Sequence, residues 1–356
     1  DSRILDERAG AAEKISGKRP RVEGDFRRIL DDADVDAVVI AAPDHWHATM
    51  AVMACQAGKD VYLEKPVSHN ISEGSAIMEA VQQYGRVLQV GTQMRSLASA
   101  EEGVQYARSG GIGDLLMAKV WNNQLRDDIG HHENSPVPDG VDYDMWLGPA
   151  PERPFNQNRF HYNWHWFWDY GTGDIGNDGV HDLDIARAAM GISEHPIRAS
   201  ATGGIRYFKD DRETPDTQVV TYTYPSGVTV LFEMRIWAPY QVHGAENGLM
   251  LFGTEGRMIY RRRQGWEVFG EKEEKIRDIS AEGDDPSAHF VNFLECIRSR
   301  ETPHCPIDGG HQSSVLAHLG NLSLRLQRDL QFDPATESFQ DEPEAKRHLP
   351  RYSPKP

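Results

Sequence analysis

The sequence predicts an α/β protein in which a Rossmann-type parallel-sheet domain precedes an α+β domain with a large, mostly antiparallel open sheet. Three observations predict this fold class. Short apolar runs alternate with amphipathic helices in the first 113 residues, two hairpin patterns rich in β-branched and aromatic residues follow, and two helical segments lie near the C-terminus. Alternating strands and helices favour parallel pairing with right-handed crossovers, whereas hairpins favour antiparallel pairing.

The first predicted domain, residues 1–113, alternates strand and helix signals. DAVVIAAP (36–43) is a continuous apolar run typical of a buried strand, and KDVYLEKP (59–66) is the next strand. Asn70 with Glu73 three residues on is a helix-capping signal. The remaining elements are a strand within 86–93, helices that end at Gly17, Gly58 and Gly85, and a helix over 99–108.

The second predicted domain, residues 114–332, is dominated by hairpins. Residues 217–237 hold two β-branched, aromatic-rich runs around the turn Pro-Ser-Gly, and residues 249–260 form a second hairpin pattern around Thr-Glu-Gly. Two helices are expected near 287–300 and 311–330, and a polar, proline-bearing C-terminal tail over 333–356.

Composition argues against two classes of partner. The chain has 38 Lys+Arg against 55 Asp+Glu, a formal charge of -17, and phosphate binding needs a basic face, so nucleic acid is not expected. No run of about 18 apolar residues is present, so no membrane span is expected. The three cysteines are too few and too scattered for a disulfide framework: Cys55, Cys296 and Cys305.

The stretch EKPVSHN (64–70) places a charged pair and a proline where a strand ends and a helix begins. In an open α/β sheet, ligands bind outside the carboxyl ends of the strands. Lys65, followed by Pro66, is therefore a candidate catalytic residue. A lone lysine after a strand is more often simply solvated, and that alternative stays open for this stretch taken alone.

The stretch WHWFWDYGTGDIGNDGVHDLDIARAAMG (164–191) has four glycines before a helix that begins near His181. Such glycines let the backbone turn sharply or approach a ligand closely. A histidine titrates near neutrality and can act as a general acid or base. A hydrogen-bonded core histidine at a helix start is the more common alternative, but the two motifs together are more specific than either alone.

Four motifs in this order, AAPDHWHA, EKPVSHN, GTQ and GTGDIGNDGVHDLDIAR, resemble those of the Gfo/Idh/MocA oxidoreductases, and the resemblance covers nearly the whole chain. It implies NAD or NADP as cofactor and reversible hydride transfer to or from a secondary hydroxyl of a sugar, inositol or related polyol. It also implies a homo-oligomer, a dimer or tetramer, formed through the second domain's sheet. Relatives with this glycine-rich pattern include exported proteins, so a cytoplasmic and a periplasmic location both stay open.

The resemblance also implies residue roles. Lys65 would hydrogen-bond the reacting hydroxyl and the nicotinamide ribose, and His181 would take or return the hydroxyl proton. Removing hydride from a carbinol leaves a carbonyl only if the hydroxyl proton also leaves, so a base and a cationic donor belong at that oxygen. The cofactor cleft would be lined by Pro43, His45, His47, Glu64, Lys65 and Gln93.

The chain departs from the family pattern at Asn177, four residues before His181, where many members have Asp. An amide can orient a substrate hydroxyl but cannot ionise. We therefore expect Asn177 to act in catalysis and substrate binding without the assistance of a carboxylate.

The family also opens with a strand, a G-x-G-x-x-G turn, a helix and a second strand, and this incomplete Rossmann-type domain begins at Asp1 without them. If the chain is complete, we expect severely reduced cofactor affinity and unpaired strands. If it is a fragment, the ordinary enzyme interpretation holds.

The segment NRFHYNWHWFWDYG (158–171) is aromatic-rich. Its rings either pack in the core and domain interface or form a platform for sugar rings. The substrate side would be lined by His161, Trp164, His165, Asn177 and His181, with Arg159 and Asn122 as weaker candidates. A metal site built from His131, His132, His161, His165 or His181 lacks a recognisable motif, so no metal is expected.

Three functions from different classes remain. The first is an NAD(P)-dependent sugar or polyol dehydrogenase. The second is an NAD-dependent glycosidase or lyase that oxidises the sugar transiently. The third is a cofactor-free protein that has lost redox activity. Net production of NADH separates the first two, and saturable cofactor binding excludes the third.

Overall fold

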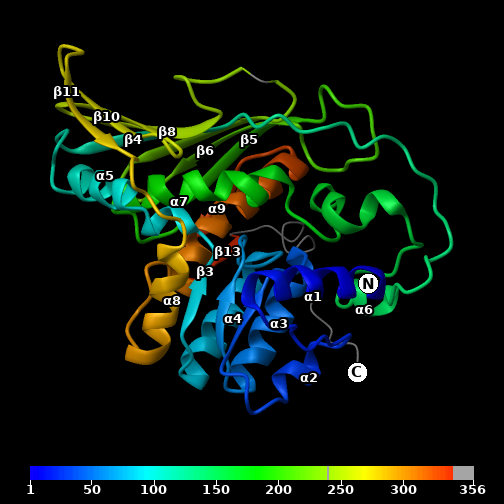
Figure 1. Cartoon of the computed structure of the whole chain (residues 1–356). Helices are drawn as coiled ribbons and strands as arrows, with labels where there is room; N and C mark the ends of the chain where they lie inside the picture. Colours follow the sequence, from blue (N-terminus) through cyan, green and yellow to red (C-terminus); the bar gives the residue numbers. More distant parts are fainter. Residues whose placement is uncertain (239, 340–356) are drawn as a thin grey trace.

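The structure, a computed structural model, describes residues 1–238 and 240–339 and contains two sheets with helices between them (Figure 1). The predicted fold class is confirmed, because the small sheet is parallel and the large sheet is mostly antiparallel. Among the described residues, no helix combines the length and the apolar character needed to cross a membrane.

The small sheet consists of β1 (Ala37–Ile40), β2 (Asp60–Leu63) and β3 (Leu88–Val90), paired in parallel in this order. Helix α3 (Asp44–Gln56) connects β1 to β2, and α4 (Ile71–Tyr84) connects β2 to β3. Because the three strands run in parallel, their carboxyl ends lie at one edge of the sheet, where ligands bind in open α/β sheets.

The predicted capping signal of α4 is confirmed. The Asn70 side chain accepts a hydrogen bond from the Glu73 amide at 3.1 Å, and the Glu73 carboxylate accepts one from the His69 amide at 2.9 Å. Gly85 ends the helix in the left-handed conformation, with φ of 60°. The first bond satisfies an amide group that the first turn of a helix leaves free, and the second ties the residue before the cap to the helix.

Strand β1 is not buried on both sides, contrary to the prediction from its apolar run. Within the described residues it pairs with β2 alone, and Val39 is 59% exposed. A strand at the edge of a sheet has a neighbour on one side only, so an apolar run does not by itself guarantee burial.

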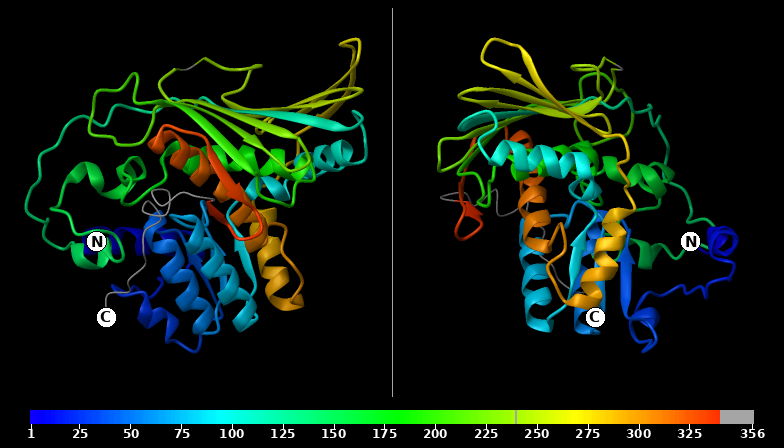
Figure 2. Two further views of the ribbon diagram at one scale, coloured as in Figure 1. Left: turned by 180° about the vertical axis from the view of Figure 1, so that it is seen from behind. Right: turned by 60° about the vertical axis from the view of Figure 1, so that its left-hand side comes forward.

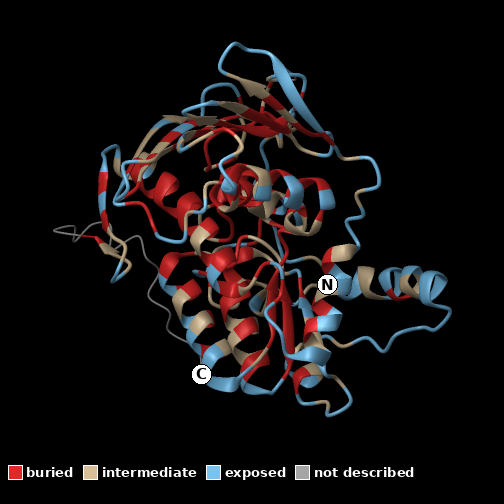
Figure 3. Ribbon diagram, turned by 90° about the vertical axis from the view of Figure 1, so that its left-hand side faces the viewer, coloured by how far each residue is buried: buried red, intermediate tan, exposed pale blue. Residues whose placement is uncertain are grey.

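Helix α1 (Ser2–Ser16) projects from the first domain (Figures 2 and 3). The Asp1 side chain caps its first turn, and Gly17 ends it with φ of 74°, as predicted. Ala9 is its buried residue, so little apolar surface holds this helix. The short α2 (Arg27–Leu30) follows.

The large sheet has β4 (Leu115–Asn122) near its centre, parallel to β7 (Thr229–Arg235) and antiparallel to β8 (Asn247–Gly253). Both predicted hairpins are confirmed, as β6–β7 and β8–β9. The strand order is β11-β10-β9-β8-β4-β7-β6-β5-β12-β13. The other strands are β5 (Arg198–Gly204), β6 (Thr217–Thr223), β9 (Gly256–Arg261), β10 (Gly265–Gly270), β11 (Lys275–Ser280), β12 (Leu330–Asp333) and β13 (Ser338–Phe339).

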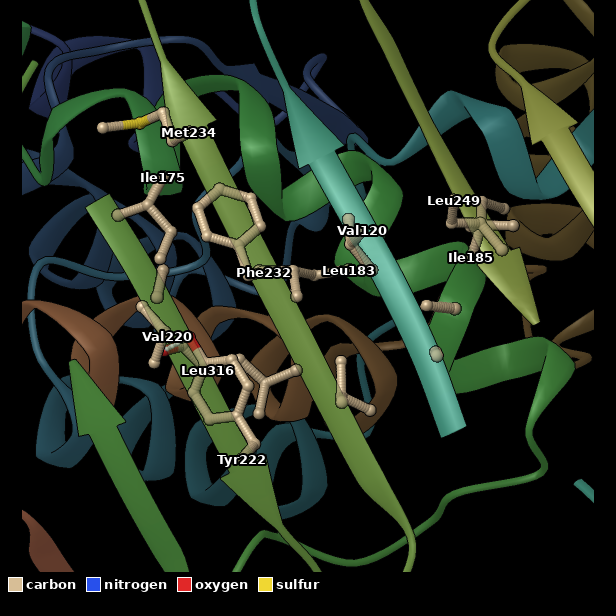
Figure 4. Packing of buried hydrophobic residues seen from close by; sticks show 14 of the residues in the cluster. Val120, Ile175, Leu183, Ile185, Val220, Tyr222, Phe232, Met234, Leu249 and Leu316 are labelled. Carbon is tan, nitrogen blue, oxygen red and sulfur yellow. Dashed lines mark hydrogen bonds between the residues drawn. The ribbon is translucent and has the colours of Figure 1, made fainter. Parts of the chain in front are cut away.

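One face of the large sheet packs against the helical layer to form the main core (Figure 4). Alternate residues of the strands, such as Val220 and Phe232, meet Leu183 and Leu316 of the helices. The layer contains α5 (Ala98–Arg108), α7 (Val180–Ala189) and α9 (Ile307–Leu326). Shorter helices are η1 (Gln93–Ser96), α6 (Tyr143–Leu147), η2 (Gln157–Arg159), η3 (His161–Trp166) and η4 (Ile175–Gly179).

The two C-terminal helices pack against the first domain. Helix α8 (Ala288–Ser299) places Phe290 and Phe293 on the ring of Tyr62 in β2. Helix α9 was predicted over 311–330 but ends at Leu326, because Gln327 adopts the left-handed conformation, with φ of 55°.

The segment from 333 onward begins as sheet. Residues 338–339, which the sequence analysis placed in the tail, pair with β12. The rest of the predicted tail, 340–356, lies outside the described residues.

Candidate functional site

Lys65, at the carboxyl end of β2, reaches from the first domain to the second. Its Nζ donates to the Asn177 backbone oxygen at 2.6 Å and to Asn177 Oδ1 at 3.2 Å. An ammonium group has three N–H donors, so these two bonds leave a third that can point to a ligand. The EKP motif and the glycine-rich motif, 112 residues apart, therefore meet at one point.

Asn177 lies in η4, a single π-helical turn directly before α7. Such turns inside helices are frequent at functional sites. The glycines explain how this turn fits: a Cβ on Gly176 would lie 2.0 Å from Thr172 Oγ1, and a Cβ on Gly179 would lie 2.7 Å from the Phe232 ring. Larger residues would push η4 away from its neighbours and displace the Lys65 anchor.

His181, in the first turn of α7, is 8% exposed, and its Nδ1 is buried without a hydrogen-bond partner among the described residues. Burial, followed by the nearby positive charges of Arg262 and Lys65, lowers the pKa of His181 to about 3. Its imidazole is therefore neutral at pH 7 and has one unprotonated nitrogen that can accept a proton.

Asn177 also contacts the buried Asp174, through Nδ2 and Oδ1 at 3.1 Å. Arg126 pairs with Asp174 at 2.8 Å, and Asn122 donates to it at 3.3 Å. Burial raises the pKa of Asp174, against the effect of Arg126. An aspartate at position 177 would place a second carboxylate beside Asp174, so the local geometry favours an amide at this position.

A second charged group, Arg262 with Asp178 and Asp182, lies near His181. Arg262 pairs with Asp178 at 2.8 Å and also with Asp182. Burial raises the pKa of Asp182 to about 6, whereas Asp178, although buried, has its pKa held below the usual range by Arg262. Arg126 and Arg262 are not predicted from the sequence. Arg262 directly follows Arg261, the last residue of β9, and successive side chains of a strand point to opposite faces of the sheet. Because Arg261 pairs with Glu267 of the neighbouring strand, this alternation could have indicated that Arg262 points the other way.

Glu64 and Gln93 meet at the ends of β2 and β3. Gln93 Nε2 donates to Glu64 Oε1 at 3.2 Å and to the Tyr62 hydroxyl at 3.1 Å. Burial raises the pKa of Glu64. Gly91 leaves room for this carboxyl group, because a Cβ there would lie 2.8 Å from it. Pro43 precedes α3 as its N-terminal cap residue, so all three residues lie at the predicted edge of the sheet.

His45 and His47 are buried and contact backbone carbonyls through both ring nitrogens. His47 links Pro66, at 2.7 Å, to Ala42, at 2.9 Å, and so joins the loops that follow β2 and β1. Burial lowers the pKa of His45 to about 3 and that of His47 to about 4. These contacts fix the loops at the sheet edge, and a role of either histidine in cofactor binding stays a prediction.

Asp44 is a further buried group that the sequence analysis did not single out. Thr172 donates to its carboxyl group at 2.8 Å, and burial raises the pKa of Asp44 to about 7. Asp44 precedes His45 in the first domain, whereas Thr172 belongs to the glycine-rich motif, so this bond is a second link between the domains near Lys65.

Comparisons with known proteins agree with this geometry. A family model described as "Oxidoreductase family, C-terminal alpha/beta domain" matches residues 121–354, and one described as "Oxidoreductase family, NAD-binding Rossmann fold" matches residues 2–92. The chain belongs to the Gfo/Idh/MocA oxidoreductase family. It is a sugar or polyol dehydrogenase-like oxidoreductase, because the relatives that match it include enzymes of that kind.

Two relatives and one solved structure illustrate the range of similarity. The chain is 27% identical to an uncharacterized oxidoreductase, YrbE, from Bacillus subtilis over 85% of the chain and 80% of that protein. It is 23% identical to the scyllo-inositol 2-dehydrogenase (NAD(+)) of Bacillus subtilis over 77% of the chain and 71% of that protein. The structure of an aldose-aldose oxidoreductase from Caulobacter crescentus complexed with glycerol has a TM-score of 0.67 at 20% identity, covering 92% of this chain and 89% of that one, and so shows the same fold.

The aromatic segment of this Gfo/Idh/MocA protein divides into two parts. Burial is the main cause of the low pKa of His165, about 4, and the charges of Lys65 and Arg126 add to it. Trp164 stacks on the His165 ring at 3.7 Å between centroids. The influence of Lys65 on His165 associates this stacked pair with the Lys65 site, and the role of both residues in substrate binding stays a prediction.

Two other predicted substrate residues point elsewhere. His161 is half exposed and contacts Asp1 at 3.2 Å. Arg159 donates to Asn134 and Pro154, and it lines a separate cavity of about 220 Å³ together with His132 and Asp211. The structure does not bring Arg159 or His161 into contact with Lys65, Asn177 or His181, and their role in substrate binding stays a prediction.

Within residues 1–238 and 240–339, the five histidines considered for a metal site do not form a close group of three ligand atoms with other His, Cys, Asp or Glu residues. His131, for example, is exposed and pairs with Asp211 at 2.7 Å. A different group of ligand atoms does come together elsewhere in the fold.

Proposed function

We propose that this chain transfers hydride between NAD or NADP and a secondary hydroxyl of a sugar, inositol or related polyol. One observation carries the proposal: Lys65, anchored across the domain boundary by Asn177, lies near a buried, neutral His181. A cation with a free N–H donor and an uncharged proton acceptor are the two groups that alcohol oxidation needs at the reacting oxygen.

The residues at the sheet edge fit a nicotinamide cofactor at its reactive end. Lys65, Glu64 and Gln93 follow two adjacent parallel strands, at the edge where dinucleotides bind in this type of fold. When bound, the nicotinamide supplies the hydride acceptor or donor. All other steps belong to the side chains of the chain itself.

In the oxidation direction, the substrate hydroxyl would accept a hydrogen bond from the free N–H of Lys65. The unprotonated nitrogen of His181 would take the hydroxyl proton as the carbonyl forms. Asn177 holds Lys65 through two of its donors, so the ammonium group cannot turn away from the oxygen. Burial, together with Arg262 and Lys65, keeps the ring of His181 neutral before the reaction.

The test is an assay of the purified chain with NAD+ or NADP+ and a panel of inositols, aldoses and glycosides, following the absorbance of the reduced nicotinamide. The Lys65→Met variant is expected to lose about 10²–10⁴-fold in kcat/KM. Lys209→Met, at an exposed lysine, is the matched control and should keep full activity.

Calorimetric titration with NAD+ and NADH, on the same chain, separates a failure to bind cofactor from a failure of the chemistry. If the cofactor binds and glycosides release their aglycone without net NADH, the reaction is a transient oxidation and the dehydrogenase proposal is wrong. Oxidation that proceeds equally well in the Lys65→Met variant would also contradict it.

A further inference from the structure

A group of two histidines and a glutamate lies apart from the Lys65–His181 site. His195 follows α7, His311 is on α9, and Glu337 is in the turn between β12 and β13. Nε2 of His195 and Nε2 of His311 both contact Glu337 Oε1, at 2.8 and 2.9 Å. One ligand atom from each residue lies within 4.8 Å of the other two.

The group is buried, and its carboxylate has several hydrogen-bond donors. The side chains of His195 and His311 are 8% and 1% exposed, and that of Glu337 is 19% exposed. The Ser75 hydroxyl donates to the second oxygen of Glu337 at 2.5 Å. Three donors on one carboxylate favour its ionised form, so the group offers one negative charge and two imidazoles.

This donor set is one that zinc prefers. Two imidazole nitrogens and one carboxylate, with an open position, form a known type of zinc site. Ligand atoms about 2.0–2.2 Å from a tetrahedral ion lie roughly 3.3 Å apart. The 2.8 and 2.9 Å contacts would thus have to open by only a few tenths of an ångström, while Ser75 keeps the carboxylate oriented.

Two locally unfavourable backbone features, a glycine inside a helix and a positive φ at a non-glycine residue, accompany this group. Gly74, inside α4, leaves room for the His311 ring, because a Cβ there would lie 2.0 Å from Nδ1. Glycine inside a helix costs about 1 kcal/mol relative to alanine. Glu337 has a positive φ of 47°, a conformation that non-glycine residues rarely adopt. Both features serve to bring the same three side chains together.

We propose that His195, His311 and Glu337 bind one divalent transition-metal ion, with Zn²⁺ as the expected ion, in place of the two N–H···O bonds. For the ion to bind, Nε2 of each ring must be free of its proton and offer its lone pair. The ion would fasten the β12–β13 turn to α9 and to the segment after α7, while Ser75 ties the same carboxylate to α4 of the first domain. The site lies outside the machinery proposed for hydride transfer.

The environment of the rings also sets the expected affinity. Nδ1 of both His195 and His311 is buried and has no hydrogen-bond partner among the described residues. Metal-bound histidines usually donate their other N–H to an acceptor, and losing such a partner weakens binding by about 10–100-fold. We therefore expect reversible binding that a chelator removes, rather than a permanently held structural ion.

The experiment is a titration of the chelator-treated, tag-free full chain with Zn²⁺ by calorimetry, and with Co²⁺ by absorbance. One equivalent is expected, with cobalt bands typical of low coordination number and a higher Tm on zinc addition. Glu337→Gln and His311→Gln should each weaken binding at least 10-fold. His132→Gln and Glu133→Gln, at exposed positions, are the matched controls and should bind as the wild type does.

Ser75→Ala guards against variants that fail to fold, since it keeps all three ligands. It should retain the cobalt spectrum while weakening binding by about 10-fold. The proposal is overturned if the wild type binds no zinc, or if zinc binding survives unchanged in the folded Glu337→Gln and His311→Gln variants.

Discussion

Two buried histidine groups connect the domains of this protein, and they differ in the charge beside the imidazole. His181 lies near Arg262 and Lys65, which add to the effect of burial and leave the ring neutral. His195 and His311 instead share the carboxylate of Glu337. The difference teaches that two buried histidine groups of one fold can have opposite charges as neighbours, cations at His181 and a carboxylate at His195 and His311.

The largest expected effect is a loss of enzymatic activity when His181, but not the second histidine group, is changed. His181→Gln should lower kcat/KM by about 10²–10⁴-fold, because an amide cannot take the hydroxyl proton. The measurement is steady-state oxidation of the best polyol found in the panel, with a thermal melt to verify folding. His132→Gln, an exposed histidine, is the control. Equal rates for wild type and His181→Gln would remove His181 from the reaction.

Asp44 is a buried carboxyl group without a cationic hydrogen-bond partner, and it is expected to make the stability of the fold depend on pH. The pKa of Asp44 is raised from 3.8 to about 7, so the folded state binds its proton more tightly than the unfolded state. The stability from Asp44 is therefore fully present below about pH 4, is lost as the pH rises from there through about 7, and changes little above that. Asp44→Asn, which can still accept the Thr172 bond, should gain about 2 kcal/mol relative to wild type between about pH 5.5 and pH 8.

Urea unfolding at both pH values measures this difference, and Asp31→Asn, at an exposed carboxyl group, is the control. A difference between Asp44→Asn and wild type that stays constant with pH would show that Asp44 titrates normally in the fold.

The amide at position 177 can be tested by giving it a charge. Asn177→Asp places a carboxylate where Nδ2 now lies 3.1 Å from Asp174. We expect a loss of about 1–3 kcal/mol in unfolding free energy, greater at pH 8 than at pH 5.5, because like charges repel once both ionise. Asn134→Asp, at an exposed site, is the control for the same chemical change. A variant more stable than wild type at pH 8 would mean that Lys65 outweighs Asp174.

An effect of similar size is expected in the second histidine group. Gly74→Ala should force the His311 ring to move and cost about 1–3 kcal/mol, although alanine is normally the better helix former. Gly24→Ala, in open space, is the control. Chemical unfolding with and without Zn²⁺ provides the measurement, and a stabilised Gly74→Ala variant would show that the ring is loosely packed.

The sequence predicts local features of this fold well. Hairpins around Pro-Ser-Gly and Thr-Glu-Gly, the Asn70 cap and the helix ends at Gly17 and Gly85 are confirmed, because each depends on residues close in the chain. The burial of β1 and the end of α9 are not predicted correctly. Those features depend on which elements pack alongside, and a single run of apolar residues does not contain that information.

The candidate site divides in the same way. The Lys65 and His181 motifs are readable as short stretches, and the structure places Lys65 against the glycine-rich turn. The charge network of Asp174, Arg126 and Arg262 is not readable, because its members come from distant elements and carry no local motif. The His195–His311–Glu337 group is not predicted from the sequence for the same reason, since its first and last members are 142 residues apart in the chain.

The return of α8 and α9 to the first domain has a practical consequence for protein engineering. Phe290 and Phe293 cover Tyr62, and Ser314 of α9 accepts the amide hydrogen bond of Val67 just after the EKP motif. A chimera that exchanges the first 113 residues with those of a relative would inherit foreign partners on both surfaces. The exchangeable unit is discontinuous, and a functional graft would have to carry residues 288–326 along with the N-terminal segment.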